Sequence, residues 1–421
     1  MWGKRLYSKY IFSKAWIGGC CVKNNKGPLQ GVTVLDLTCV LSGPYGTSWL
    51  SDMGATVIKV ENPLNGDATR ASGPFINGCS NYYATVNRNK KCVTLNLKDP
   101  VGKKMFLDLV QQVDVLTENF KPGTMEKLGF GYETMKKVNP KLVYASISGY
   151  GQNGPYSHRP GYDVVAQAMG GIMSYTGFAE NPPTKCGPSI GDITAGMNLV
   201  VGVLAALYRA KTTGEGERVE VSLVDSVLAL TTQDYIDYGH TKNLPQRLGN
   251  GYSLWCPYGS YKAKDRYYSI GIGTEKHWEI FCRDILKRPE LINDPDFCDH
   301  PVRVKNRERT DAIVDAWAQQ LTAAQVVDIL NAHGIPGALV YDYSDIEADE
   351  NFTVHRQMIK HMQHPVMGDI SYINIPVRFQ EAGLVEPEAA GSLGQFNEEV
   401  YGKYLGLSKE EVEQLRANGT I

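Results

Sequence analysis

Two short apolar runs near the N-terminus constrain the fold more than any other feature. GVTVLDLT (31–38) and ATVIKVE (55–61) have the length and composition of strands, and between them lie a turn, VLSGPYG, and a helical segment to about Gly54. Apolar runs of this length, bounded by turn residues, are typical of buried strands. A strand–helix–strand unit places its two strands parallel in one sheet. The sequence therefore predicts a parallel sheet at the centre of the chain.

The same alternation continues for about 170 further residues. Strands are predicted at 91–98, 114–120 and 141–151, and RVEVSLVDSVLALTTQ (218–233) indicates a strand that runs into a helix. Helices are predicted at 101–113, over YDVVAQAMGGIMSYTGF, and over the apolar run that begins MNLVV. Strands that alternate with helices indicate a doubly wound α/β layer.

The character of the chain changes near Asn243. PQRLGN (245–250) is rich in turn residues, and residues 252–275 favour two antiparallel strands around the turn KAKD. Residues 277–335 are mostly helical, GALVYDYSDI returns to a strand-like pattern, and the chain closes with GDISYINIPVRF and the acidic helix SKEEVEQLRANG. A second, smaller α+β domain is therefore expected after the α/β layer.

The charge balance and the cysteines limit the classes of function. The net charge is -2, so no strong field draws the chain to nucleic acid or to acidic lipid. The nine cysteines form no CxxC pair, and neither they nor the eight histidines have metal-ligand spacing, which favours a reducing compartment and no metal site. The apolar run at 199–208 is shorter than the roughly 18 residues of a membrane span. We interpret it as a core helix, and expect no membrane partner.

The first 27 residues are basic. No acid occurs before Asp36, and the basic residues of this segment are Lys4, Arg5, Lys9, Lys14, Lys23 and Lys26. The charge resembles that of a mitochondrial presequence, but the segment is poor in arginine and not clearly amphipathic. We interpret it as a basic extension before folded sequence that starts near Pro28. The expected location is the cytoplasm, or the mitochondrial matrix if the segment is a presequence.

Asp192 is the most informative acid in the sequence. It follows Gly191 and stands directly before a long apolar helical pattern, which is the spacing of a helix N-cap. One interpretation is that Asp192 only caps the helix. The other is a carboxylate kept anionic by the helix dipole so that it can attack an acyl carbon.

Two further features lie at predicted strand ends. The turn Leu41-Ser42-Gly43-Pro44 follows the first strand, where ligands of open α/β sheets bind. It could expose backbone N–H groups to a ligand, or be a simple strand–helix turn. Asp163 could form a catalytic carboxylate pair with Asp192, or act as a second N-cap.

The sequence contains the letters of a dinucleotide-binding fingerprint, GxGxxG, without the helix that should follow them. GYGQNG (149–154) follows a predicted strand, but the next residues, PYSHRP, cannot open a helix. Without a helix N-terminus the pyrophosphate of a dinucleotide has no cradle. Glu61 ends the second strand, where a ribose-binding acid would lie, but the glycines that should accompany it are missing. We therefore reject dinucleotide binding at the GYGQNG segment, and the signal at the first strand–helix turn is weak. The motif GxSxG is also absent, so a hydrolase nucleophile elbow has no support.

The motifs taken together resemble a known family, the class III CoA-transferases, which include formyl-CoA:oxalate and carnitine CoA-transferases. The similarity covers residues 28 to 400, and its motifs are GVTVLDLT…SGP, MGATVIKVE, NRNKK…LNLKDP, ENFKPGTMEKLGF, YASISGYGQNGP, RPGYDVVAQAMGG, GPSIGDITAGM and ALYRAKTTGEGERVEVSL. The ordered set is far more specific than any one motif.

The resemblance implies a fold and an assembly. A Rossmann-like large domain would be formed by residues 28–240 and by the C-terminal segment 346–421, with a linker and small α+β domain at 241–345. Two such chains would interlock as a homodimer.

The resemblance also implies site residues. The aspartate of the GD motif, here Asp192, would be the nucleophile that forms an acyl anhydride and then an aspartyl-CoA thioester. CoA and acyl-CoA would be substrates, with no permanently bound cofactor. The positions that match the CoA site are Val40, Leu41, Ser42, Leu95, Lys98, Asn119, Phe120 and Lys127, and Tyr162 and Asp163 border the active site. The two lysines suit CoA phosphates as point charges.

Three differences bear on the substrate. Relative to the formyl-CoA:oxalate enzyme, Leu41 replaces a glutamine, Asn62 replaces an arginine, and the glycine-rich lid is missing. They argue against oxalate–formate exchange but not against a transferase. Two segments, ENFKPGTMEKLGF and PQRLGN, are similar to those of the family members that act on small dicarboxylic acids. Aryl, hydroxy-acid and bile-acid acceptors are the alternatives.

Two other functions fit the same fold. An α-methylacyl-CoA racemase would place a histidine where this chain has Tyr162, as one of two bases for proton transfer, so Tyr162 argues against it. A non-catalytic CoA-binding protein would not need the GD motif at Asp192.

Overall fold

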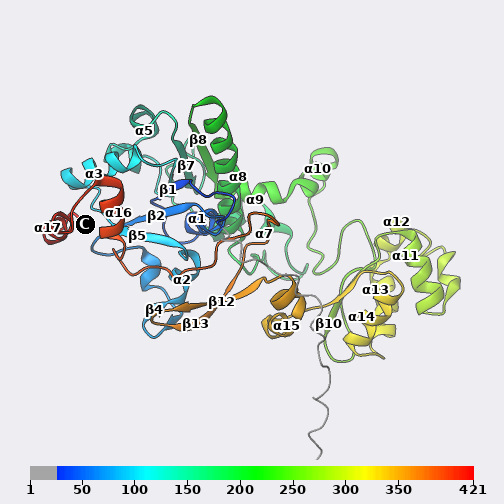
Figure 1. Ribbon diagram of the computed structural model, residues 1–421. Coiled ribbons are helices and arrows are strands. Elements are labelled where there is room, and N and C mark those ends of the chain that lie inside the picture. Colours follow the sequence, from blue (N-terminus) through cyan, green and yellow to red (C-terminus); the bar gives the residue numbers. More distant parts are fainter. Residues whose placement is uncertain (1–25) are drawn as a thin grey trace, which may run out of the picture.

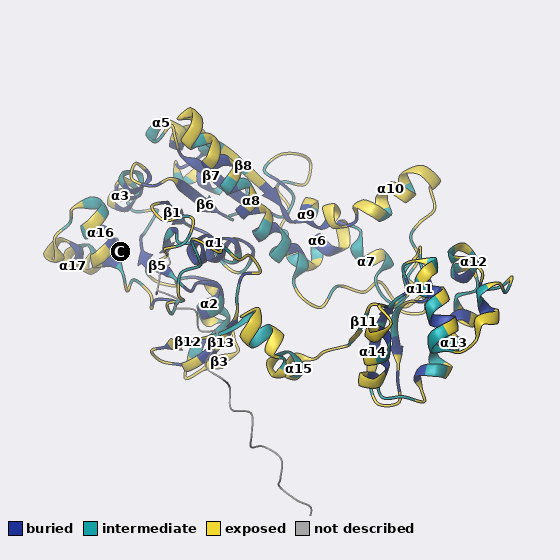
Figure 2. Cartoon of the chain, turned by 45° about the vertical axis from the view of Figure 1, so that its right-hand side comes forward, coloured by how far each residue is buried: buried dark blue, intermediate teal, exposed yellow. Residues whose placement is uncertain are grey.

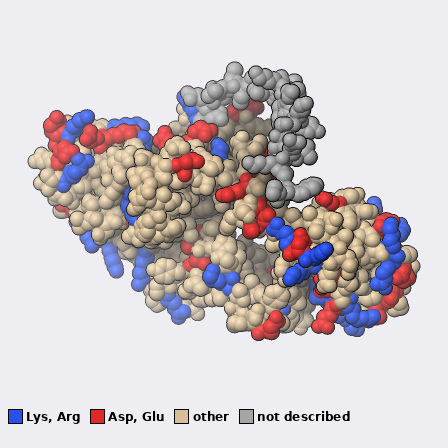
Figure 3. All heavy atoms as spheres, turned by 90° about the horizontal axis from the view of Figure 1, so that it is seen from below, with Lys and Arg blue, Asp and Glu red and all other residues tan. Residues whose placement is uncertain are grey.

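The computed structural model describes residues 26–421, so almost all of the predicted basic extension, 1–27, lies outside the described residues. Figure 1 shows two lobes joined by extended segments, with the larger lobe built around a sheet. Acidic and basic side chains are interspersed on both lobes (Figure 3), in keeping with the small net charge.

The large lobe contains the predicted parallel sheet. Its strands are β1 (Thr33–Asp36), β2 (Thr56–Glu61), β5 (Lys90–Thr94), β6 (Val115–Glu118), β7 (Val143–Ser148) and β8 (Glu217–Ser222). They lie in the order β5-β2-β1-β6-β7-β8, and every neighbouring pair is parallel. Numbered within the sheet, this is the Rossmann order 3-2-1-4-5-6. The α/β prediction is confirmed, although most strands are shorter than the apolar runs that predicted them.

Two helical layers cover the sheet. On one face lie α1 (Ser42–Asp52), α6 (Asp163–Met169), α8 (Ile190–Thr213) and α9 (Leu223–Leu230), which share an apolar core with Val34 and Val143. On the other lie α3 (Pro100–Val110), α4 (Thr124–Leu128) and α5 (Tyr132–Val138), packed with Leu35 and Ile58. Successive strand residues such as Val34 and Leu35 point to opposite faces, so a strand buried on both faces is apolar throughout.

Helix α8 is longer than the apolar run that predicted it. It spans 24 residues, and its length and mean hydropathy of 1.7 satisfy the simple criteria for a membrane span. It nevertheless packs against α1, β7, β8 and α9, which is the environment of a core helix.

The small lobe has an antiparallel sheet of three strands in the order β11-β10-β9: β9 (Tyr258–Lys262), β10 (Tyr267–Gly271) and β11 (Gly337–Leu339). Two of its helices, α13 (Arg307–Ala318) and α14 (Ala323–Ala332), pack on one face of this sheet around Tyr268, Phe281 and Val314. The other elements here are α11 (Glu275–Ile280), η2 (Phe281–Ile285), η3 (Pro289–Ile292) and α12 (His300–Lys305).

The chain then returns to the large lobe, where the hairpin β12 (Ile359–His364) and β13 (Gly368–Ile373) precedes α16 (Asn397–Leu405) and α17 (Lys409–Ala417). Figure 1 shows α16 beside α3 and β5. Three hydrogen bonds to Thr94 fix it there: Thr94 N–H donates to Asn397 Oδ1 at 2.9 Å, Asn397 Nδ2 donates to Thr94 Oγ1 at 2.8 Å, and the Tyr401 hydroxyl donates to Thr94 O at 2.6 Å. The edge strand β5 is therefore covered by a helix that lies some 300 residues further along the chain.

Short elements complete the description. They are η1 (Ala68–Ala71), β3 (Phe75–Ile76), β4 (Cys79–Ser80), α2 (Asn81–Val86), α7 (Ile172–Tyr175), α10 (Thr232–Thr241), α15 (Tyr343–Ala348) and η4 (Asn351–His355).

Candidate active site at the sheet switch point

The strand order fixes where a ligand would meet the sheet. From β1 the chain runs outward through β2 to β5, and then in the other direction through β6 to β8, so the order reverses between β1 and β6. Ligands of open α/β sheets bind at the carboxyl ends of the strands at such a point. The segments that leave β1 and β6 contain five predicted site residues: Val40, Leu41, Ser42, Asn119 and Phe120. The fold thus brings two predicted segments, 80 residues apart, to one place.

Asn119 ties these two segments together. Its Oδ1 accepts the Cys39 backbone N–H at 2.8 Å, and its Nδ2 donates to Cys39 O at 2.8 Å. The amide is therefore occupied by the β1 turn rather than free for a ligand. Phe120 is half-buried against the core beneath. Both residues shape the floor of the switch point.

Val40 has an unusual backbone conformation at this turn. Its φ is 69°, in the left-handed region that β-branched residues rarely occupy, and its side chain is exposed. Its N–H lies 3.3 Å from Asp67 Oδ1, and Asp67 Oδ2 accepts from Lys59 Nζ at 2.9 Å. Lys59 also donates to Thr38 O at 2.7 Å. A buried ion pair thus holds the turn in a conformation of the kind that often marks a functional site.

The ion pair is well supported electrostatically. Burial alone would lower the pKa of Lys59, but Asp67 and Asp36 outweigh it and the net change is upward. For Asp67, burial is likewise outweighed by Lys59, and the pKa is lowered. Both groups therefore stay charged. Removing either partner would leave the other as an unpaired buried charge, which would destabilise the fold. Neither residue was a sequence prediction, because a lysine inside a strand gives no sign of its burial.

Helix α8 lies directly against α1. A Cβ on Gly196 would approach Ser42 O to 2.6 Å, and a Cβ on Gly46 would approach Gly196 O to 2.6 Å, so both glycines are needed for this close backbone contact. Asp192 precedes Gly196 by four residues and so lies on the same face of α8, one turn closer to its N-terminus. This geometry directs Asp192 towards the start of α1, beside the switch point.

Asp192 does not cap α8. The N-cap is Ser189, and Asp192 lies in the first helical turn without a capping hydrogen bond. The prediction of an N-cap was therefore wrong by three residues, because the helix already begins at Ile190. Among residues 26–421 its carboxylate accepts no hydrogen bond, which leaves both oxygens available to a substrate.

The carboxylate is also more basic than the N-cap interpretation implied. Its partial burial, and secondarily the charge of Asp163, raise the pKa of Asp192 from 3.8 to about 6. It is still mostly ionised at neutral pH. A carboxylate with a raised pKa is a better nucleophile than an ordinary aspartate, because its basicity is greater.

The expected cap is supplied by Asp163. It is the first residue of α6, not its N-cap, which is Tyr162. Its Oδ1 accepts the Gly191 N–H at 2.8 Å, so Asp163 satisfies one free donor at the start of α8 from another helix. Tyr162 is 72% exposed and points to solvent in the single chain.

One residue near Asp192 was not predicted. Tyr82 in α2 is half-buried, and burial, with the charges of Asp192 and Asp67, raises its pKa to about 12. The phenol therefore stays protonated and can donate a hydrogen bond near the nucleophile candidate. The local sequence NYYAT carries no signal for this role, since Tyr82 and Asp192 are 110 residues apart in the sequence.

The remaining predicted CoA residues lie along the same edge of the sheet. Leu95, just beyond β5, is 2% exposed and its side chain belongs to the core, so only its backbone could meet a ligand. Lys98 lies four residues beyond the end of β5, and Lys127 lies in α4, which follows β6. Both are exposed. Their positions allow contact with phosphate groups at the edge.

The structure shows the surroundings of the GYGQNG segment and of Glu61. No helix opens between Gly149 and Tyr162. Instead, Gly149 and Gly161 touch through their backbones, since a Cβ on either would lie within 2.8 Å of the other Cα. Glu61 is bound by Arg70 in a bidentate ion pair and by the Tyr83 hydroxyl at 2.8 Å, so it is not available to a ribose.

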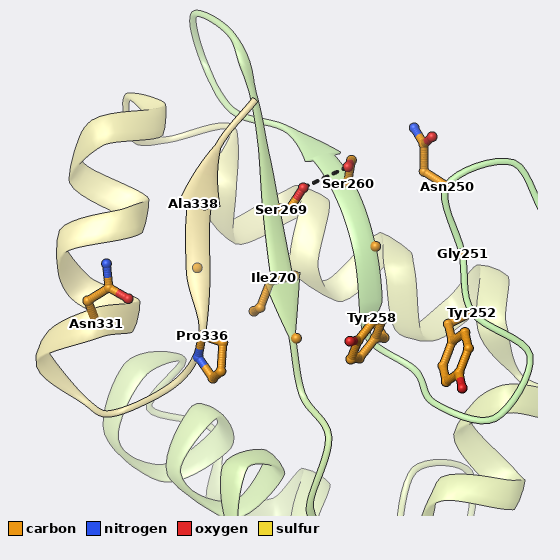
Figure 4. Close-up of a pocket in the computed structure, with 13 residues that line it drawn as sticks. Asn250, Gly251, Tyr252, Tyr258, Ser260, Ser269, Ile270, Asn331, Pro336 and Ala338 are labelled. Atoms are coloured by element: carbon orange, nitrogen blue, oxygen red, sulfur yellow. Dashed lines mark hydrogen bonds between the residues drawn. The ribbon is translucent and has the colours of Figure 1, made fainter. Parts of the chain in front are cut away.

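A separate cavity of about 660 Å³ lies in the small lobe (Figure 4). Its floor carries the hydrogen-bonded pair Ser260 and Ser269, 2.8 Å apart, and Tyr252 and Tyr258 stand at one side. It contains no charged side chain. The sequence did not predict this cavity, because it is lined by residues of the linker, of the three short strands β9, β10 and β11, and of α14, which are far apart in the sequence.

Comparison with known proteins identifies the chain. The family model "CoA-transferase family III" matches residues 29–396. The acetyl-CoA:oxalate CoA-transferase of Acetobacter aceti is 40% identical over 321 residues, which is 76% of this chain and 82% of the relative. The succinyl-CoA:glutarate CoA-transferase of Mus musculus is 36% identical over 395 residues, 94% of this chain and 90% of the relative.

A solved structure has the same fold. A crystal structure of a CAIB/BAIF family protein from Brucella suis superposes with a TM-score of 0.79 at 31% identity, covering 90% of this chain and all of that one. The protein belongs to CoA-transferase family III, and is an enzyme that transfers CoA between acyl-CoA thioesters and carboxylic acids.

Proposed function

We propose that Asp192 carries the CoA transfer through covalent intermediates. Its carboxylate attacks the acyl carbon of the donor thioester and displaces CoA thiolate, forming a mixed anhydride. The thiolate attacks the aspartyl carbonyl of this anhydride, which releases the donor acid and leaves an aspartyl-CoA thioester. The acceptor carboxylate then displaces CoA, and CoA attacks the acceptor carbonyl of the second anhydride to give the new thioester and free Asp192. Covalent catalysis divides one difficult exchange into easier steps.

The observation that carries this proposal is the environment of Asp192. It lies in the first turn of a core helix beside the switch point, accepts no hydrogen bond in the described chain, and has a pKa of about 6. A purely structural aspartate at a helix start would be expected to cap the helix, and here Asp163 does so instead. Free N–H groups at the adjacent α1 N-terminus can stabilise the developing oxyanion.

CoA would lie along the carboxyl edge of the sheet. The turn Val40–Ser42 would contact it closely through backbone N–H groups, and Lys98 and Lys127 would bind its phosphates. These roles are consistent with the exposure of Val40 and both lysines. The proposed mechanism uses no metal and no redox cofactor.

For the acceptor we propose a small dicarboxylic acid. The names of the two curated relatives above include oxalate and glutarate, and both are dicarboxylates. Their donors are acetyl-CoA and succinyl-CoA, which makes these the first donors to test.

We further propose a homodimer. An apolar surface remains uncovered on the single chain along the outer side of α8, α9 and α10, and Figure 2 shows α10 as mostly exposed. The residues are Val201, Tyr208, Leu228, Leu230, Tyr235 and Ile236, each at least 47% exposed. Exposed apolar side chains on successive helices are typical of a protein interface. Light scattering should give a mass about twice the 46.5 kDa of one chain, and a monomeric mass would contradict the proposal.

The function is tested by a mass-spectrometric screen of acetyl-, succinyl- and formyl-CoA against a panel of mono- and dicarboxylates. Exchange should occur with wild type and be lost in Asp192→Asn, while CoA binding measured by calorimetry is retained. Asp225→Asn is the matched control, because Asp225 occupies the first turn of the neighbouring helix α9 and should leave exchange unchanged. Full activity of Asp192→Asn would refute the mechanism.

The same screen separates the alternatives. A racemase would incorporate deuterium from D₂O at the α-carbon of a branched acyl-CoA without transferring CoA. A binding protein would do neither.

A further inference from the structure

Gln167 in α6 is fully buried, with a relative exposure of 0%, and both ends of its amide are hydrogen-bonded. Its Nε2 donates to Asp163 Oδ2 at 2.7 Å and lies 3.4 Å from Pro188 O. Its Oε1 accepts the Cys186 N–H at 2.8 Å. A buried amide with all these partners is a rigid element, because any alternative conformation would leave polar groups unpaired.

These bonds hold an otherwise weakly anchored segment. Residues 182–188 form no helix or strand. Within the described chain, their other hydrogen bonds are local: Thr184 to Pro182 O, Lys185 Nζ to Cys186 O and Gly187 O, and Ile190 N–H to Pro188 O. The two bonds to Gln167 are the ones that join this segment to another helix. The segment leads directly into α8 and Asp192.

Gln167 also fixes the orientation of the Asp163 carboxylate. The two residues are four apart in α6 and so lie on the same side of the helix. The bond from Gln167 to Oδ2 leaves Oδ1 directed at the Gly191 N–H, at 2.8 Å. A continuous chain of hydrogen bonds therefore runs from Cys186 through Gln167 and Asp163 to Gly191, the residue before Asp192.

We propose that Gln167 is a positioning residue for CoA transfer: it anchors the Cys186–Gly191 segment and the Asp163 carboxylate so that Asp192 is held at the switch point. The inference rests on the proposed role of Asp192 as nucleophile. Gln167 touches neither substrate nor the reacting atoms. Displacing a reacting group by about 1 Å can cost a factor of about 100 in rate.

The main test is Gln167→Met, which keeps the side-chain length and removes all three hydrogen bonds. We expect kcat to fall about 10- to 100-fold with little change in KM for acyl-CoA, because the CoA residues belong to other segments. The matched control is Asn198→Ala. It removes a different bond from α8, from Asn198 Nδ2 to Ser226 Oγ at 3.0 Å, and should leave kcat unchanged.

A second variant protects the test against loss of folding. Gln167→Glu keeps the acceptor for Cys186 N–H but puts a carboxylate against Asp163. Added negative charge disfavours ionised Asp192, so the acidic limb of the kcat profile should move to higher pH. A merely structural role for Gln167 would lower the thermal stability of Gln167→Met but leave its kcat at the wild-type value under conditions where the variant is folded.

The outcomes separate the two proposals. If wild type forms a covalent adduct on Asp192 and both Gln167 variants keep the wild-type kcat and pH profile, the positioning role is wrong and the mechanism stands. If wild type forms no adduct on Asp192, the nucleophile assignment itself fails.

Discussion

The carboxylate of Asp163 accepts a hydrogen bond from the backbone N–H of Gly191 at 2.8 Å, across the junction of α6 and α8. One acid thereby caps the helix that carries another. The charge of Asp163 also raises the pKa of Asp192, although burial makes the larger contribution. In the proposed mechanism the two carboxylates therefore have separate tasks: Asp163 caps α8, and Asp192 acts as the nucleophile.

Asp192→Asn should stabilise the protein at neutral pH. The pKa of Asp192 is raised in the folded state, from 3.8 to about 6, so its ionised form carries a penalty that is fully present above pH 6 and absent below about pH 4. After allowance for partial exposure, the asparagine variant should unfold with a free energy about 1–2 kcal/mol higher at pH 7.5. Thermal melts at pH 7.5 and pH 4 test this. An equal gain at both pH values would show that the pKa is not raised.

Glu118→Gln, at the end of β6, should also stabilise the protein at high pH. Burial is the main cause that raises the pKa of Glu118 from 4.5 to about 7, and Glu126 adds to it. The penalty is therefore complete above pH 7 and disappears below pH 4.5. A glutamine oxygen can still accept the Phe120 N–H, bound at 2.8 Å. We expect a gain of about 2 kcal/mol in unfolding free energy at pH 8.5 that vanishes towards pH 4.5. A loss of stability at pH 8.5 would contradict this account.

Gly196→Ala should damage both stability and activity. The added methyl group would lie 2.6 Å from Ser42 O, so α1 and α8 must separate. Overpacking of this kind costs about 1–3 kcal/mol. The separation also displaces Asp192 from the start of α1, so kcat should fall at least about tenfold.

The control for this substitution is Gly402→Ala in α16. Its added methyl group would meet only Leu407 O at an ordinary 3.5 Å, and alanine favours a helix by up to about 1 kcal/mol. Similar losses in both variants would show that the α1–α8 contact has no special importance.

Cys39 should resist alkylation despite its place in the β1 turn. Burial, and then the charge of Asp67, raise the pKa of its thiol to about 11, so little thiolate exists at pH 8. Among the seven cysteines of residues 26–421, Cys298 is the exposed one and should react first with iodoacetamide, as peptide mass spectrometry would show. Faster labelling of Cys39 would mean that the turn opens in solution.

The sequence predicted the sheet well because its signals are local. Five of the six parallel strands coincide with largely apolar runs, the sixth, β8, has the alternating pattern ERVEVS, and the βαβ rule then predicts the parallel pairing. Val40 and Asn119 were expected in one site only through the family resemblance, and the parallel order of β1 and β6 places both at the carboxyl edge of the sheet.

What could not be predicted depends on contacts between distant residues. Whether Asp192 or Ser189 caps α8 is decided by the backbone conformation at Ser189 and by Asp163, 28 residues earlier. The burial of Lys59 depends on Asp67 in the following loop, and the electrostatic influence of Asp192 on Tyr82 depends on the packing of α2. None of these partners is marked by its own sequence neighbourhood.

The central claim is that Asp192 is acylated during turnover. The direct measurement is hydroxylamine trapping with acetyl-CoA or succinyl-CoA, followed by peptide mass spectrometry of wild type and Asp192→Asn. Hydroxylamine attacks the aspartyl carbonyl of an activated intermediate and leaves a hydroxamate on the residue. We predict this modification on Asp192 in wild type only. A wild-type enzyme that transfers CoA without it, or an Asp192→Asn variant with full activity, would contradict the account.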